Sequence, residues 1–113
     1  MKYYERIKCK RMALTMNEIE FAETIGVDVM TYLKFEAGDA VSDSVFKDVR
    51  RGWNTYSNTL DKDRRLQISI LSYVFSLSYQ NKFEKQNTIN YIVRDIGKLG
   101  TRLFKSENEE EES

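Results

Sequence analysis

No proline occurs anywhere in the 113 residues, and apolar side chains recur three and four residues apart along most of the chain. Proline is the residue that most strongly interrupts a helix, and a period of about 3.6 residues is typical of an amphipathic helix. The sequence therefore predicts an all-α protein. Over residues 72–79 apolar residues and serines alternate, which also fits a strand, but no turn residues lie beside this stretch and the helix is favoured.

Residue types that build enzyme sites are scarce. The chain has no histidine and one cysteine, Cys9, so its own side chains cannot form a zinc site, a Ser-His-Asp triad, a Cys-His dyad or an internal disulfide. No glycine-rich phosphate loop or paired-carboxylate constellation is visible. The longest mostly apolar stretch, 66–79, is shorter than the about 20 residues that cross a bilayer. We expect no enzyme, no metal or cofactor, no membrane partner and a cytoplasmic location.

The 18 basic and 18 acidic residues cancel, but they are unevenly distributed. Residues 1–11 are mostly basic, whereas glutamates are the only charged residues in 107–113. Such an acidic end is usually disordered and solubilising, and it can also compete with a polyanion for a basic patch. The sequence predicts a net basic body with a disordered acidic tail over 107–113.

Start and stop signals divide the first 60 residues into helices. Asn17 and Glu20 form a capping box, although Thr15 and Glu18 offer a rival start two residues earlier, and Gly26 stops this helix. The expected helices run over 3–13, from Asn17 to Gly26, from Asp28 to about Gly38, and from Ser42 to Trp53. Ile7, Arg11 and Leu14 share one face of the first helix. The residues expected to be buried in the second are Ile19, Phe21, Ala22 and Ile25.

Two short helices around a glycine turn have the geometry of a helix-turn-helix. Residues 17–38 read NEIEFAETIGVDVMTYLKFEAG and resemble this motif in the Xre-like family, which includes lambda repressor and Cro. In that family a small residue, here Ala22, lets the two helices approach. A glycine, here Gly26, makes the turn, and an apolar residue, here Val27, anchors it.

The resemblance extends beyond the turn. Glu36-Ala37-Gly38 matches the Glu-x-Gly that closes the recognition helix, and 41–53 looks like the next helix of the same fold without the proline often found at its start. The resemblance implies a lambda repressor-like five-helix domain over 1–60, followed by a helical extension over 61–106.

The family's contact positions map onto residues of mixed chemistry. The resemblance implies that five positions reach bases or phosphates: Glu18, Val29, Met30, Leu33 and Lys34. Of these, only Lys34 is an easy phosphate partner, because Glu18 repels a phosphate or accepts from a cytosine amino group. Asp28 is expected at the N-cap of the recognition helix, where it adds a negative charge.

The three apolar residues at these positions, Val29, Met30 and Leu33, leave alternatives open. They could press against thymine methyls, form an interface with another protein, or be covered by the C-terminal half of the chain. Basic residues of the first and fourth helices are candidate phosphate contacts or solvated surface. These are Lys8, Lys10, Arg11, Lys47, Arg50 and Arg51.

Two more helices are expected in the C-terminal half. Asp61 or Asp63 starts the first and Asn87 or Thr88 starts the second. The first carries one polar stripe, made by Arg65, Ser69, Ser72, Ser76 and Gln80, and is otherwise apolar. The second repeats apolar residues at three and four, a seam typical of helices packed along one another. The seam residues are Ile89, Ile92, Ile96, Leu99 and Leu103.

Appended apolar helices favour a homodimer, with a monomeric helical hairpin as the alternative. The sequence thus predicts a dimeric, repressor-like regulator of transcription that binds double-stranded DNA, of the kind common in bacteria and phages. The alternative is a protein-binding module, such as an antirepressor or an inhibitor, that keeps the helix-turn-helix fold without reading DNA. In that case Val29, Met30 and Leu33 contact the partner protein.

Overall fold

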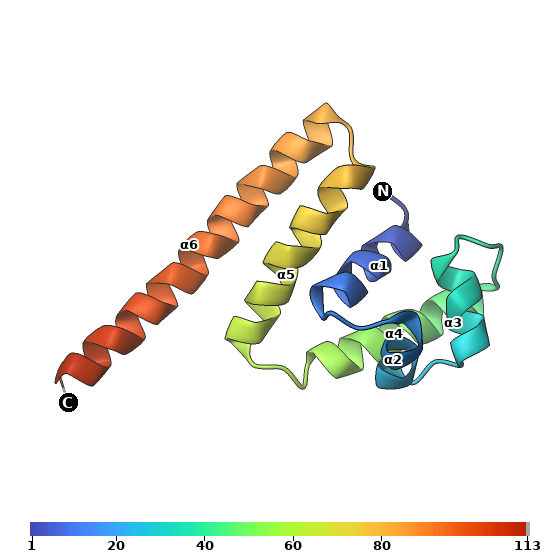
Figure 1. Ribbon diagram of the computed structural model, residues 1–113, viewed down its shortest axis with the longest axis horizontal. Helices are drawn as coiled ribbons and strands as arrows, with labels where there is room; N and C mark the ends of the chain where they lie inside the picture. Colours follow the sequence, from blue (N-terminus) through green and yellow to red (C-terminus); the bar gives the residue numbers. More distant parts are fainter. Residues whose placement is uncertain (113) are drawn as a thin grey trace.

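The computed structural model describes the backbone of residues 1–112 and the side chains of residues 1–105 (Figure 1). The tail predicted over 107–113 lies outside the residues whose side chains are described. The elements are α1 (Tyr3–Ala13), α2 (Glu18–Ile25), α3 (Val29–Glu36), α4 (Asp43–Ser57), α5 (Lys62–Ser76), a 3₁₀ turn (Leu77–Tyr79) and α6 (Lys82–Glu112). No strand occurs within 1–112, so the all-α prediction is confirmed. The strand alternative for 72–79 is wrong, because α5 and the 3₁₀ turn occupy it.

The helices form two groups (Figure 1). α2, α3 and α4 lie together at one end, while α5 and α6 run side by side in opposite directions at the other. α1 lies between the groups and packs mainly against α5 and also against α3. The expected division at residues 60 and 61 falls in the turn that joins α4 to α5. The five helices expected over 1–60 are wrong in number, because this stretch contains four α-helices and α5, which packs on α1, begins after the division.

Local signals set the starts of α2 and α3. The Asn17 side chain accepts the Glu20 amide N–H at 2.8 Å, and the Glu20 carboxylate accepts the Asn17 amide N–H at 3.4 Å, which confirms this capping register over the rival one at Thr15. Gly26 ends α2 with φ +72°, a conformation that glycine adopts without strain. Asp28 then caps α3 by accepting the Thr31 amide N–H at 3.0 Å.

The predicted starts of the later helices are only partly correct. α4 follows Ser42, although this serine makes no capping hydrogen bond. Of the two candidates for α5, Asp61 is correct: its carboxylate accepts the Arg64 amide N–H at 2.8 Å. The expected start of the last helix at Asn87 or Thr88 is wrong. α6 begins at Lys82 because Asn81 accepts the Glu84 amide N–H at 2.9 Å and caps the helix more than a turn earlier.

Aromatic side chains dominate the core of the α1–α4 end. Phe21, Tyr32 and Phe35 are fully buried or nearly so, and the Phe21 and Tyr32 rings lie 5.4 Å apart. Ile7 and Val49 complete this core from α1 and α4. Ile19, which we expected to face inward, is 53% exposed. That prediction is wrong, because α2 turns Phe21, Ala22 and Ile25 to the core and leaves Ile19 on the opposite side.

A glycine sets the distance between α2 and α4. A Cβ atom on Gly52 would lie 2.1 Å from the backbone oxygen of Ile25, which is closer than any real contact. The two helices therefore meet backbone to backbone at this point. Residue 52 has to lack a side chain for the end of α2 to rest on α4.

Candidate nucleic-acid interface

α3 presents one side to the core and the other to solvent. Tyr32, Phe35 and Glu36 are buried against α1, α2 and α4. Met30 is 64% exposed and Lys34 is exposed one turn further along. The alternative that the C-terminal half covers the apolar residues of this helix is therefore wrong for Met30.

The remaining predicted residues of α3 lie at the edge of this exposed side. Val29 and Leu33 are half-buried, and Val29 packs against the core. The outward row of α3 thus consists of Met30 and Lys34, with Leu33 contributing part of its side chain. Asp28 stands exposed at the start of the row.

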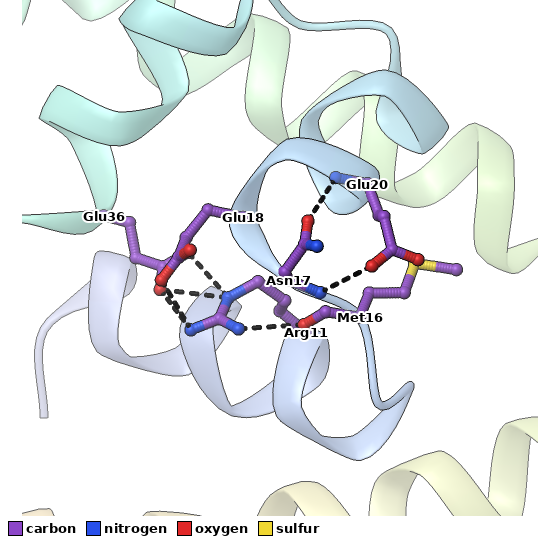
Figure 2. A network of polar contacts seen from close by, with 6 residues as sticks. All are labelled: Arg11, Met16, Asn17, Glu18, Glu20 and Glu36. Carbon is purple, nitrogen blue, oxygen red and sulfur yellow. Dashed lines mark hydrogen bonds and ion pairs between the residues drawn. The ribbon is translucent and has the colours of Figure 1, made fainter.

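Arg11 is held by a network of polar contacts (Figure 2). Its Nε donates to both carboxylate oxygens of Glu36 at 3.0 Å, and one Nη donates to Glu36 Oε1 at 2.6 Å. The other Nη donates to the Met16 carbonyl oxygen at 2.9 Å. Glu18 Oε1 lies 3.5 Å from the guanidinium. The ion pair of Arg11 and Glu36 joins α1 to the last turn of α3, and the contact of Arg11 with the Met16 carbonyl anchors the loop before α2.

This network withdraws Arg11 from the predicted phosphate contacts. The side chains of Arg11 and Glu36 are only 11% and 7% exposed, and the guanidinium donors are turned to protein acceptors. Burial alone would lower the pKa of Arg11, but the hydrogen bonds and charge of Glu36 outweigh it and raise the pKa. The prediction that Arg11 binds DNA is corrected: it is a structural cation.

Lys10 also packs against other residues of the protein. Its Nζ lies 5.3 Å from the centre of the Trp53 ring, and the residue is half-buried next to Leu60 and Ile68. Burial lowers the pKa of Lys10. We therefore assign Lys10 to the packing of α1 on α4 and α5 rather than to a phosphate contact. Lys8 remains partly exposed.

The other predicted cations lie on the surface of α4. Lys47, Arg50 and Arg51 are exposed, and together with Asn54 they line a shallow hollow of about 390 Å³. Arg50 stacks over the Tyr3 ring at 5.3 Å, and its guanidinium keeps an open side to solvent. With Lys34 on α3, these residues are exposed cations that phosphate can reach on α3 and α4.

Carboxylates accompany the exposed row of α3, and two of them are partly neutralised. Glu18 lies beside Arg11, and Asp28 accepts both the backbone N–H and the hydroxyl of Thr31 at 3.0 Å. These hydrogen bonds hold the pKa of Asp28 below its ordinary value. Glu20 and Glu23 of α2 are exposed without such compensation beyond the capping contact of Glu20.

The five residues of the predicted dimer seam differ in exposure. Ile92 and Leu99 are half-buried, whereas Ile89, Ile96 and Leu103 are 42%, 53% and 55% exposed. The side of α6 that meets α5 is instead partly polar, because Thr88 and Asp95 are its most buried residues. Tyr91 of α6 stacks on Tyr73 of α5 with ring centres 5.9 Å apart.

Two structural residues escaped prediction from the sequence. Gly52 was not singled out, because no local pattern shows that another backbone touches it. Glu36 was interpreted only as part of the turn after the recognition helix. A signal for its pairing existed: Arg11 shares the inward face of α1 with Ile7 and Leu14, and a buried cation requires a carboxylate partner.

Among the described residues, no three His, Cys, Asp or Glu side chains gather where they could hold a metal ion. No helix in the described part of the chain is long and apolar enough to span a bilayer. Comparisons with protein-family models, with curated proteins and with solved structures find no match to this chain.

Proposed function

We propose that this chain is a lambda repressor-like helix-turn-helix protein that binds double-stranded DNA through α3 and regulates transcription. The observation that carries the proposal is the outward row of α3. Met30 and Lys34 are exposed one turn apart, while Tyr32 and Phe35 anchor the same helix in the core. An apolar group suits a thymine methyl and an ammonium suits a phosphate.

The charge around α3 is less unfavourable than the sequence suggested. Glu18 is paired with Arg11, and the charge of Asp28 is stabilised by the N-terminal N–H groups of α3. Lys34, Lys47 and Arg50 remain open to solvent. A few such cations supply most of the non-specific affinity for a duplex through counterion release.

Selection of binding sites from a random duplex pool tests the proposal. We expect the chain to enrich a defined sequence. Met30→Ala should then reduce discrimination between that sequence and others, because the lost contact is to a base. Lys34→Gln should weaken binding to all sequences alike and reduce the salt slope by about one. Lys98→Gln, which alters an exposed lysine of α6, is the control and should change neither.

A second candidate function is binding of a partner protein through α2 and α3. Ile19 and Met30 are large, apolar and more than half exposed, and Glu20 and Glu23 add negative charge beside Ile19 on α2. Such a surface suits a partner with an apolar centre and a basic rim. The parent chain should then capture a partner protein whether or not nuclease is added, and the Met30→Asp variant should not capture it. It should be kept with Lys98→Gln, and purified partner should bind the chain directly.

A further inference from the structure

One side of α6 displays apolar residues that no part of the described chain covers. Val93, Ile96 and Leu103 are 64%, 53% and 55% exposed, and Ile89 is 42% exposed. With Gly100 they are spaced four, three, four and three residues apart, so they form a single stripe along the helix. We call these five residues the α6 stripe.

α5 extends this apolar surface. Leu71 and Val74 are 40% and 47% exposed, on the side of α5 away from buried Ser72 and Ser76. The stacking of Tyr73 on Tyr91 and the contact of Asp63 with Arg102 fix the antiparallel alignment of the two helices. In this alignment Leu71 and Val74 stand at the level of residues 89–93. The helical positions of the two groups place them on the same side of the pair.

The residues before and after the α6 stripe carry opposite charge. Four and seven residues before Ile89, the exposed residues are Lys85 and Lys82. Continuing toward the C-terminus, the sequence places Glu107 and Glu110 at the equivalent positions, and α6 runs to Glu112. Lysines therefore precede the α6 stripe and glutamates follow it in the sequence.

We propose that a second copy of this chain packs antiparallel along the α6 stripe. Setting Ile96 opposite Ile96 of the second copy brings Ile89 opposite Leu103, and the small Gly100 allows close approach. In the same register, position 85 of α6 lies opposite position 107 and position 82 opposite position 110, and the sequence has lysine at the first position and glutamate at the second position of each pair. A parallel arrangement would oppose like charges at both ends, so charge selects the antiparallel one.

The charge pattern also favours a second copy over a membrane surface. An interfacial helix carries its cations on the polar face around an apolar face, and an acidic end would be repelled by anionic lipid. Here the two lysines lie in line with the apolar residues and the glutamates follow at the opposite end. When two copies pack antiparallel, the basic end of each copy therefore lies opposite the acidic end of the other.

Sedimentation equilibrium of the full chain tests the pairing. We expect twice the monomer mass at micromolar concentration, and a single-chain mass for both Ile96→Asp and Val93→Asp. Both residues are more than half exposed in the single chain, so the helical circular dichroism should be retained. Phe83→Asp is the matched control: Phe83 is 75% exposed on α6 but outside the stripe, and this variant should stay dimeric. A monomeric parent chain, or stripe variants as dimeric as the control, would overturn the proposal.

Charge exchange tests the direction of packing. Lys85→Glu should weaken the dimer, and Lys85→Glu combined with Glu107→Lys should restore it, because the antiparallel register pairs these positions. In a parallel dimer each position faces itself, so neither change would alter the balance of like charges. An unaffected Lys85→Glu dimer would overturn the antiparallel register. Neither outcome depends on whether α3 binds DNA.

Discussion

The α1–α4 end and the α5–α6 pair use their apolar residues in opposite ways. In the first region Phe21, Tyr32 and Phe35 are buried, and Ile19 and Met30 are the large apolar residues left more than half exposed. In the second, Thr88 and Asp95 are buried between the helices, and Ile96 is among the apolar residues left in solvent. The first region buries its large apolar residues in one core, to which α5 contributes Ile68. The second leaves much of its apolar surface exposed.

The largest expected effect is on the buried ion pair that joins α1 to α3 in the first region. Glu36→Gln leaves the buried guanidinium of Arg11 without its main counter-charge. It should lower the free energy of unfolding by about 3 kcal/mol. The measurement is urea unfolding followed by the fluorescence of Trp53, the single tryptophan.

The exposed pair of Arg51 and Asp48 provides the control for this prediction. These groups lie 3.9 Å apart with side chains 77% and 60% exposed. Asp48→Asn should therefore change stability by less than about 1 kcal/mol. Equal losses from Glu36→Gln and Asp48→Asn would contradict a structural role for the buried pair.

Gly52→Ala should give the next largest loss, again in the α1–α4 end. Alanine favours a helix by about 1 kcal/mol over glycine, but its Cβ would collide with the Ile25 backbone oxygen. The collision should outweigh the gain and leave a net loss of about 1–3 kcal/mol. A thermal melt of the variant would contradict the close α2–α4 approach if its midpoint rose.

Gly97→Ala should have the opposite sign, because α6 leaves room at this position. Nothing lies within 4 Å of a Cβ built on Gly97. The variant should gain about 0.5–1 kcal/mol from helix propensity alone. The same thermal melt measures it. A loss of stability at Gly97 would show that α6 is packed more tightly than the structure indicates.

The smallest expected effect is the pH dependence at the start of α3. The pKa of Asp28 is lowered by its hydrogen bonds with Thr31. Its contribution is therefore complete above the pKa of the unfolded chain and is lost as pH falls through the lower folded value. Asp28→Asn keeps a capping oxygen and removes this titration. Acid unfolding curves should show a slightly weaker pH dependence for the variant. Identical curves for the two proteins would show that Asp28 does not contribute to the pH dependence of stability.

The sequence predicts features that depend on neighbouring residues. The capping box at Asn17, the turn at Gly26 and the cap at Asp28 all appear as expected, because each is made within a few positions of the chain. The α6 start was missed for a different reason. Asn81 with Glu84 is a local signal of the same kind, but the later Asn87 and Thr88 were preferred.

Features that join distant segments could not be predicted from local patterns. Arg11 looked like a surface cation because its partner, Glu36, comes from another helix. The seam of α6 was recognised as apolar, but its direction was not, because the sequence does not show that Thr88 and Asp95 face α5. The exposed state of Met30 likewise depends on how α3 is set against α1, α2 and α4.

Titration of a labelled random-sequence duplex with the full chain at low salt, followed by fluorescence anisotropy, tests the central claim most directly. We expect binding that weakens steeply as salt is added. Lys34→Gln should reduce this binding, and Lys98→Gln should leave it unchanged. No binding at low salt would contradict DNA recognition by α3. The outward row of Met30 and Lys34 would then be assigned to contact with a partner protein.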